Sequence, residues 1–268
     1  MRNGVKKFTL EYHPVDWCGI DRPTRLNLPN LQILELLKPK TIIIRNCVLA
    51  DLRLDKPGLP SSLWEEIETL VLVCSPKQHI FFIAFSNWIK TAEMKHLKRV
   101  YWVFDPMIDA PASCGQSIKT FDMFDRLVNT IVESNLFDWV NLALLNPLKS
   151  PESDIEIHYI NPECIYSALD RTQKLDFLDR CYRYRLLKDE DLTSGTLESR
   201  TVKFQNAFLF EFQIITWCQL ERMMRVDGLE EDKKEERRKL INFKSLQKWV
   251  EEDEKDWSQW FDRDDLVR

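Results

Sequence analysis

The first candidate for chemistry in this sequence is a thiol. Cys114 lies between Ser113 and Gly115, in a stretch whose composition is typical of a loop. A cysteine becomes a nucleophile only when a base lies beside it. The histidines that could act as that base are His79, His96 and His158. Nothing in the sequence brings any of them near Cys114, so the pattern favours a free thiol without a catalytic role.

Metal and nucleotide sites are weakly indicated. His13 and Cys18 are two possible zinc ligands, five residues apart and without an obvious second pair. The six glycines form no G-x-G-x-x-G or G-x-x-x-x-G-K motif, which a phosphate-binding loop needs. Cys74-Ser75-Pro76 and Asp105-Pro106 follow expected strands, where α/β enzymes place functional groups, but such residues commonly form the turn that ends a strand. We expect no catalytic, cofactor-binding or metal-ligating residue.

One stretch has the residue types of a nucleic-acid site. Its basic and aromatic side chains are Arg180, Tyr182, Arg183, Tyr184, Arg185 and Lys188. Bases stack on aromatic rings while cations contact phosphates, so a single-strand binder uses this interleaving. The same stretch contains acids that cancel its field: Asp176, Asp179, Asp189, Glu190 and Asp191. Because the whole chain has a net charge of −5, we expect a solvated helix face here and no nucleic-acid partner.

Aromatic residues near the C-terminus are the candidate interaction residues. Trp257, Trp260 and Phe261 are spaced three and four apart among acidic residues. This spacing places side chains on one face of a helix, where they could dock on a protein partner. They could also fold back on the chain's own helices around residues 204–223, since burial contributes about 25 cal/mol per Å² of apolar surface. We expect this burial, and a free acidic and aromatic tail is the alternative.

Five short apolar runs are the expected strands. They cover residues 41–45, 68–73, 99–104, 140–145 and 155–160. Most are rich in β-branched or aromatic residues and nearly free of charge, the pattern of strands buried on both faces of a largely parallel sheet. We expect Trp102, in the third run, to be deeply buried. The short link after residue 145 could let the fifth run pair antiparallel with the fourth.

Weaker patterns predict further strands and the helices. Residues 7–12 alternate as a half-buried edge strand does, and residues 240–243 form a possible short strand. Ser245 could cap a last helix. Helical periodicity predicts crossover helices at residues 77–98 and 121–135, long helices at residues 163–187 and 202–226, and a solvated helix or linker at residues 230–239.

Together these elements define the expected organisation. The predicted fold class is α/β: a largely parallel sheet of about five strands with crossover helices, irregular and repeat-like, followed by a helical C-terminal part. Residues 1–162 form the sheet region. Residues 163–268 form the helical region packed on it, as one continuous domain.

The L-x-x-L-x-L strand spacing of a leucine-rich repeat occurs three times: Ile67-x-x-Leu70-x-Leu72, Leu97-x-x-Val100-x-Trp102 and Phe137-x-x-Val140-x-Leu142. Two further segments resemble those of such irregular repeats: Leu28-Pro29-Asn30-Leu31 and Leu59-Pro60-Ser61-Ser62-Leu63. Residues 28–160 thus resemble the irregular leucine-rich-repeat-like region of fungal F-box-type proteins. The resemblance implies an interaction surface rather than an active site. Those proteins carry an N-terminal F-box helix bundle, which residues 1–30 do not supply.

Composition narrows the class of protein. The seven cysteines are scattered and odd in number, which indicates reduced, non-ligating thiols and a cytoplasmic or nuclear location. No run of about 18 apolar residues occurs, so we expect no membrane contact. The predicted function is a non-catalytic protein-interaction scaffold with an unknown protein partner. The alternative is an enzyme or small-ligand binder on a doubly wound α/β sheet, with its site at the carboxyl ends of the strands.

Overall fold

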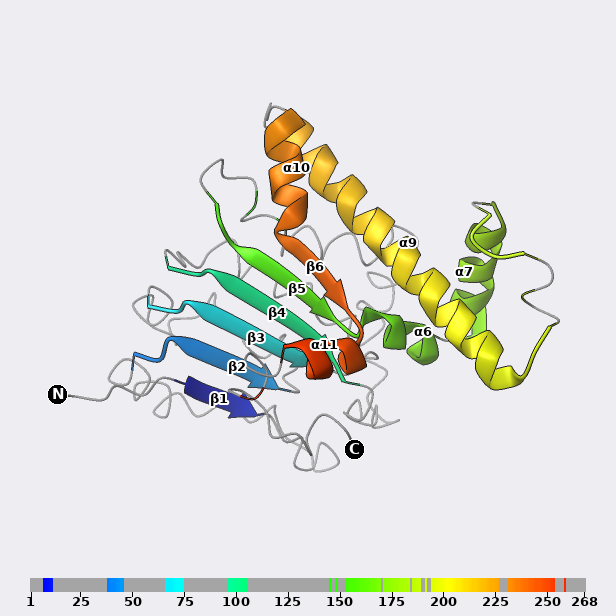
Figure 1. Cartoon of the computed structure of the whole chain (residues 1–268), viewed down its shortest axis with the longest axis horizontal. Helices are drawn as coiled ribbons and strands as arrows, with labels where there is room; N and C mark the ends of the chain where they lie inside the picture. Colours follow the sequence, from blue (N-terminus) through cyan, green and yellow to red (C-terminus); the bar gives the residue numbers. More distant parts are fainter. Residues whose placement is uncertain are drawn as a thin grey trace, which may run out of the picture.

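The computed structural model describes the strands of a sheet, the helices that follow residue 160 and short connecting segments. The described residues are 7–11, 38–45, 66–74, 96–105, 145, 148, 153–169, 171–183, 185–188, 191, 194–226, 231–253 and 258. Within them the chain forms one six-stranded sheet, with helices after its fifth strand (Figure 1).

The sheet is parallel throughout its described part. Its strands lie side by side in chain order: β1 (Lys7–Glu11), β2 (Thr41–Arg45), β3 (Thr69–Cys74), β4 (Arg99–Phe104), β5 (Glu156–Ile160) and β6 (Ile241–Lys244). The predicted α/β class, with a largely parallel sheet and a helical C-terminal part, is confirmed. The two edge strands, β1 and β6, come from the segments with the weaker sequence patterns.

The strand order decides between two kinds of parallel sheet. In a doubly wound sheet the order reverses at a switch point, and ligands bind in the crevice that the reversal opens. Among the six described strands there is no reversal, since each strand pairs with its neighbours in sequence. Crossovers between such parallel neighbours are right-handed in nearly all proteins. The alternative of a doubly wound sheet is therefore wrong in its topology.

The region between β4 and β5 also differs from expectation. Leu145, the described residue of the run at residues 140–145, lies in a helical conformation rather than in a strand. β5 pairs in parallel with β4 on one side, with Ile157 opposite Val100, and with β6 on the other, so the antiparallel pairing that the short link allowed with residues 140–145 does not occur. The rest of that run and the helix predicted at residues 121–135 lie outside the described residues.

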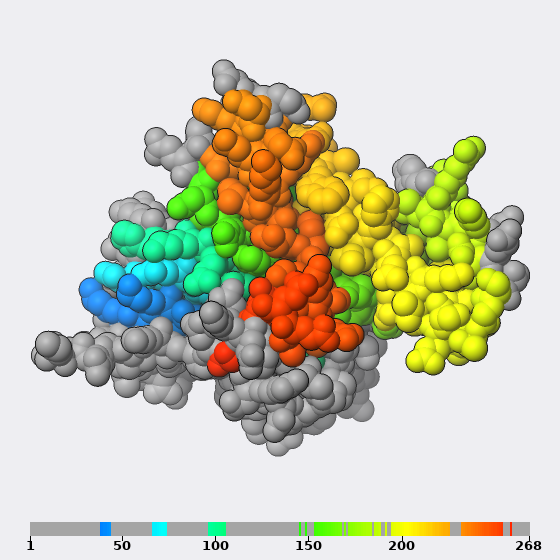
Figure 2. Space-filling model, viewed as in Figure 1, coloured from blue at the N-terminus to red at the C-terminus, as the bar shows by residue number. Residues whose placement is uncertain are grey.

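Helices follow β5. A 3-10 turn at Pro162–Cys164 leads into α6 (Ile165–Ala168), α7 (Arg171–Arg183), α9 (Leu197–Val226) and α10 (Glu231–Lys239), and α11 (Leu246–Glu252) follows β6. α9 has 30 residues and begins beyond the edge of the sheet, beside α7. Figures 1 and 2 show α7 and residues 197–210 of α9 extending away from the strands, and we call these two segments the helical arm.

The long helix predicted at residues 163–187 is wrong, because the chain breaks it between α6 and α7. Leu169 has an extended backbone, with φ −62° and ψ 139°, and its N–H bonds to the carbonyl of Tyr166. No glycine or proline stands at this break. Leu169 is buried in the core, so tertiary packing rather than local propensity ends α6 here.

One face of the sheet, which we call the helix face, shares its core with α6, α7 and α9. In register across the strands, one row of this face consists of Ile42, Leu70, Val100, Ile157 and Ile241. All are buried in one core, because alternate side chains of a strand point to the same side. Trp102, two residues beyond Val100, is 1% exposed in the same core, which confirms its predicted burial.

The opposite face, the α11 face, has a smaller core. It contains Ile43, Val71, Val73, Tyr101, Val103 and Ile160, packed with Trp249 of α11. Ser245 is the N-cap of α11, and its Oγ accepts a hydrogen bond from the backbone N–H of Lys248 (3.2 Å), as predicted for a capping serine. The inner strands are thus buried on both faces, which is why their sequences lack the alternation of a half-exposed strand.

Charged side chains lie directly before the first residues of β2, β3 and β4. The Glu68 carboxylate contacts Lys40 on one neighbouring segment and Lys98 on the other, the latter at 3.2 Å. These hydrogen bonds lower the pKa of Glu68. The backbone N–H groups of Glu68 and Lys98 donate to the carbonyls of Lys40 and Glu68, respectively (2.8 and 2.9 Å). Side chains and backbone therefore fix the same register along successive strands.

Asn161 links three strands at the carboxyl edge of the sheet. It follows β5 in the left-handed conformation, with φ 61° and ψ 37°. Its Nδ2 donates to the carbonyl of Phe104 at the end of β4 (2.9 Å), and its backbone N–H donates to the carbonyl of Lys244 in β6 (2.7 Å). The side chain is needed for the first of these bonds, and asparagine tolerates the left-handed region better than most residues.

Two substitutions of Asn161 should separate these roles. Asn161→Ala removes the buried amide and strains the left-handed backbone, so we expect the free energy of unfolding to fall by about 2–4 kcal/mol. Asn161→Gly removes the same bond but relieves the backbone, so its loss should be smaller by about 1 kcal/mol. Urea unfolding of both variants measures the difference. Equal losses would contradict a contribution from the backbone.

Candidate interaction surface

Exposed apolar side chains gather on two helices. Among the described residues, the large hydrophobic side chains with the greatest exposure all belong to α7 and α9: Leu175 (58%), Leu197 (75%), Val202 (50%), Phe210 (48%) and Ile214 (38%). The apolar side chains described on both faces of β3 and β4 are buried. Two neighbouring helices that expose several large apolar side chains are candidates for a binding surface.

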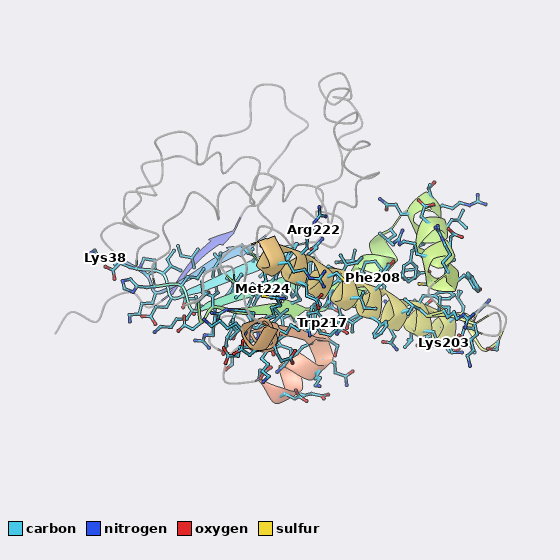
Figure 3. The ribbon with its side chains drawn as sticks, turned by 90° about the horizontal axis from the view of Figure 1, so that it is seen from above. Lys38, Lys203, Phe208, Trp217, Arg222 and Met224 are labelled. Carbon is cyan, nitrogen blue, oxygen red and sulfur yellow. The ribbon has the colours of Figure 1, made fainter. Side chains whose placement is uncertain are left out.

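α9 carries these side chains away from the sheet. In Figure 3, Met224 lies at the end of α9 that is next to the strands, and Lys203 lies toward the opposite end. Phe208, between them, is buried and packs its ring 5.6 Å from that of Phe177 on α7. The inner side of the arm is therefore a fixed core, and its outer side presents Val202 and Phe210 to solvent.

A cleft of about 380 Å³ opens between the helices of the arm and α6. Its described lining comprises Tyr166, Ser167, Lys174, Leu178, Leu197, Arg200, Thr201 and Phe204. The four residues from α9 have the i, i+3, i+4, i+7 spacing of a single helix face. The lining thus combines aromatic and aliphatic carbon with two cationic side chains.

Packing and hydrogen bonds hold the inner part of the cleft in place. The ring of Tyr166 lies 5.3 Å from that of Phe177 and 5.8 Å from that of Phe204, and Lys174 Nζ lies 5.5 Å from the Tyr166 ring centre. Gln205 Nε2 donates to Ser167 Oγ (3.0 Å), which joins α9 to α6. Burial raises the pKa of the Tyr166 hydroxyl, so this group stays neutral in the cleft.

An ion pair joins α7 to α9. Arg180 donates from Nε to Glu211 Oε1 (2.6 Å) and from Nη2 to Glu211 Oε2 (3.2 Å), a two-bond geometry. Arg183 contacts Asp179 on the same helix. Carboxylates therefore engage two cations of the stretch considered for nucleic acid, and Arg180 is half-buried instead of lying on a solvated face.

Cys181 and Cys218 should differ in reactivity. Burial, with a smaller effect of Glu211, raises the pKa of the Cys181 thiol to about 12, whereas Cys218 is exposed on α9. Because the thiolate is the reactive form, iodoacetamide at neutral pH should label Cys218 about tenfold or more faster than Cys181. Peptide mapping by mass spectrometry measures both rates in one sample. Equal rates would contradict the closed packing of α7 on α9.

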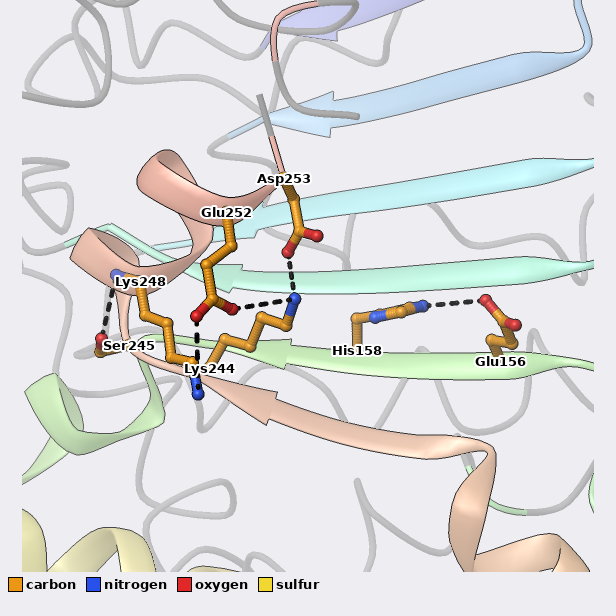
Figure 4. A network of polar contacts seen from close by, with 7 residues as sticks. All are labelled: Glu156, His158, Lys244, Ser245, Lys248, Glu252 and Asp253. Atoms are coloured by element: carbon orange, nitrogen blue, oxygen red, sulfur yellow. Dashed lines mark hydrogen bonds and ion pairs between the residues drawn. The ribbon is translucent and has the colours of Figure 1, made fainter. Parts of the chain in front are cut away.

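The other residues considered for chemistry are dispersed. His158 stacks on Tyr101, with ring centres 4.4 Å apart, and its Nε2 lies 3.3 Å from Glu156 Oε2 (Figure 4). His96 is exposed in the turn before β4, and Asp105 follows that strand. Trp257, Trp260 and Phe261 lie outside the described residues, as do His13, Cys18, His79 and Cys114. The role of the three aromatic residues stays a prediction.

A second polar network connects β6 with α11 and the residue that follows it. Lys244 of β6 contacts Asp253 and lies 3.8 Å from Glu252, which also lies 3.9 Å from Lys248 (Figure 4). All four side chains belong to the segment that forms β6 and α11. The network therefore stabilises this segment itself, and its four residues form no catalytic arrangement.

Comparisons with known proteins leave the structure as the basis for function. No family model, curated protein or solved structure matches this chain. In the part of the chain that the structure describes, no three metal-ligating side chains of His, Cys, Asp or Glu lie close enough to hold an ion. The described helices include none with the length and apolar character that crossing a membrane requires. The arm and its cleft are thus the most distinctive surface on the described residues.

Sequence reasoning did not single out the cleft. Leu197, Arg200 and Phe204 share a helix face, but this pattern alone equally suits a face that packs inside the protein. The missed signal was apolar character at Leu175 and Val202, on the sides of α7 and α9 that polar residues would ordinarily occupy. α6 lines the cleft only because the chain breaks at Leu169, and the sequence did not reveal this break.

Proposed function

We propose that this chain is a non-catalytic protein-interaction scaffold, with the sheet as its platform and the helical arm as its binding surface. The observation that carries the proposal is that the most exposed large apolar side chains among the described residues all lie on α7 and α9, and that one of them, Leu197, also lines the cleft. A partner that covers them removes apolar area from water, worth about 25 cal/mol per Å².

The sheet suits the role of a platform. Its strands follow one another in register, and the repeated spacing places Ile67, Leu70 and Leu72 in the same core as Leu97, Val100 and Trp102. Repeat proteins stack successive strand units in this way and commonly bind other proteins. This arrangement supports the proposed relation to the leucine-rich-repeat-like region of fungal F-box-type proteins.

Site-specific photo-crosslinking in the native cell tests the proposal. A photoreactive amino acid placed at Phe210 or at Leu175 should capture the same protein, whereas the same group at Gln247 on α11 should not. Val202→Asp, combined with the photoreactive group at Phe210, should lower the yield about fivefold or more, because a charge on the outer side of α9 opposes apolar burial. Gln247→Asp is the matched control. Capture that is equal at all three positions, or absent from the arm, would overturn the proposal.

A further inference from the structure

We propose that the cleft of the helical arm binds an acidic peptide segment of a partner protein, with an apolar side chain next to a carboxylate. This inference rests on the proposed interaction function and names the chemistry of the partner. Three properties of the cleft support it: its cationic lining, its apolar lining and the exposure of Leu197 at its edge.

The described lining of the cleft is cationic, although the whole chain has a net charge of −5. Lys174 lines it from α7 and Arg200 from α9, and none of the described lining residues is acidic. Glu198, next to Leu197, is exposed and is not among them. The charge argument rests on Lys174, whose ammonium group contacts a carbonyl oxygen and an aromatic ring and can attract a carboxylate of a partner, because complementary charge steers and orients it.

The lining beside these cations is apolar. Leu178, Leu197 and Phe204 contribute aliphatic and aromatic carbon, and Tyr166 adds its ring. A volume of about 380 Å³ lies at the small end of the range for ligand pockets, roughly 300–1,000 Å³. The cleft is therefore large enough for a bulky apolar side chain and a neighbouring carboxylate rather than for a large cofactor.

The hydroxyl groups of the cleft already have partners. Thr201 Oγ1 donates to the carbonyl of Leu197 (2.9 Å), and Ser167 Oγ accepts from Gln205. Lys174 Nζ lies 3.5 Å from the carbonyl of Ser167, which holds the ammonium group at the cleft. Recognition of an incoming anion therefore depends chiefly on charge, and recognition of its neighbour depends on apolar contact.

A peptide fits this surface better than a nucleic acid does. Cations near the cleft are engaged by carboxylates, since Lys203 Nζ lies 2.8 Å from Asp191 Oδ1 and Arg183 contacts Asp179. A continuous track for phosphates is therefore lacking among the described residues of the arm. In contrast, Leu197 carries apolar surface from the cleft to its exposed rim, where a peptide can continue.

Binding of defined peptides to the full chain tests the inference. Three fluorescent twelve-residue peptides of glycine and serine carry two Leu–Glu pairs, two Leu–Lys pairs or two Ser–Glu pairs. Fluorescence anisotropy should show the tightest binding for Leu–Glu, with about fivefold or more loss for Ser–Glu and no saturable binding for Leu–Lys. Raising the salt from about 0.05 to 0.5 M should weaken the Leu–Glu complex, because salt screens exposed charges.

Charge reversal locates the binding site. Lys174→Glu should weaken Leu–Glu binding about tenfold or more, and Lys233→Glu, an equal change of charge at an exposed residue of α10, away from the arm, should change it less than about twofold. Lys174→Gln serves if reversal unfolds the arm, as far-ultraviolet circular dichroism would show. Similar binding of Leu–Glu and Leu–Lys, no Leu–Glu binding, or equal effects at Lys174 and Lys233 would overturn the inference.

The same assay separates the possible outcomes. If photo-crosslinking captures a partner through the arm but Lys174→Glu leaves Leu–Glu binding unchanged, the interaction function stands and the acidic-peptide inference fails. If Leu–Glu binds in the cleft but nothing crosslinks to the arm, the interaction function fails. A synthetic peptide of residues 254–268, which carries Trp257, Trp260 and Phe261 among acids, is the competitor. Displacement of Leu–Glu by an equimolar amount of it would assign the cleft to residues 254–268 of this chain, its own or those of a second copy, and overturn a separate partner.

Discussion

Trp102→Ala should lower the free energy of unfolding by about 3–5 kcal/mol, the usual cost of deleting a buried aromatic side chain. Trp102 lies near the middle of β4 and is 1% exposed. Its ring centre lies 4.7 Å from that of Phe104 and 6.0 Å from that of Tyr159. Alanine would remove these contacts and leave a cavity that the surrounding β-strands cannot fill without moving.

Chemical unfolding followed by circular dichroism measures this loss. The matched control is Phe210→Ala, an aromatic deletion at a side chain that is 48% exposed on α9, for which we expect a change within about 1 kcal/mol. If Trp102→Ala unfolds at the same denaturant concentration as the parent, the ring does not hold the helix face together. The central position of β4 in the core would then be contradicted.

The inner strands could be predicted because burial on both faces leaves a local mark. The predicted bounds at residues 41–45 and 99–104 are those of β2 and β4, and β3 is shifted by one residue. In such a strand every side chain contacts a core, so charged residues disappear from the run. This constraint lies within five or six residues, which is why a single sequence reveals it.

The pairing of the strands was harder to predict than the strands themselves, because it depends on residues far apart in the sequence. β5 and β6 are neighbours in the sheet, although about 80 residues of helix and loop separate Ile160 from Ile241. Their sequences show that each is apolar but not which strand lies beside them. The antiparallel pairing considered for β5 relied on the shortness of a link, and a short link allows such a pairing without requiring it.

The cleft was even harder to predict from the sequence, because three helices form it. A continuous helix over residues 163–187 would have joined Tyr166 and Lys174 on one rod, whereas the structure places them on α6 and α7. The extended backbone of Leu169 causes this change, and burial rather than residue type selects that backbone. Similarly, the charges around Arg180 suggested a solvated face until Glu211, 31 residues away, was seen to pair with it.

Trp249→Ala should release α11 from the sheet. Trp249 is 1% exposed, its ring centre lies 6.1 Å from that of Tyr101, and it packs in the core of the α11 face with Val103. A helix of seven residues is too short to persist alone in water, so α11 depends on this contact. We expect a loss of about 3–5 kcal/mol. Hydrogen exchange should show that the amides of α11 lose protection while those of β4 keep it, since the helix face has its own core.

The polar contacts of α11 should not hold the helix on the sheet once the ring of Trp249 is removed. Lys244 keeps its ion pairs with Glu252 and Asp253 in this variant, but such partly exposed pairs contribute only about 0–1 kcal/mol. Gln247→Ala, on the exposed side of the same helix, is the control and should leave the exchange pattern unchanged. If the amides of α11 stay protected in Trp249→Ala, and about 1 M salt then exposes them, charge rather than apolar packing holds this helix. That result would contradict the assignment of the α11 face as a second core.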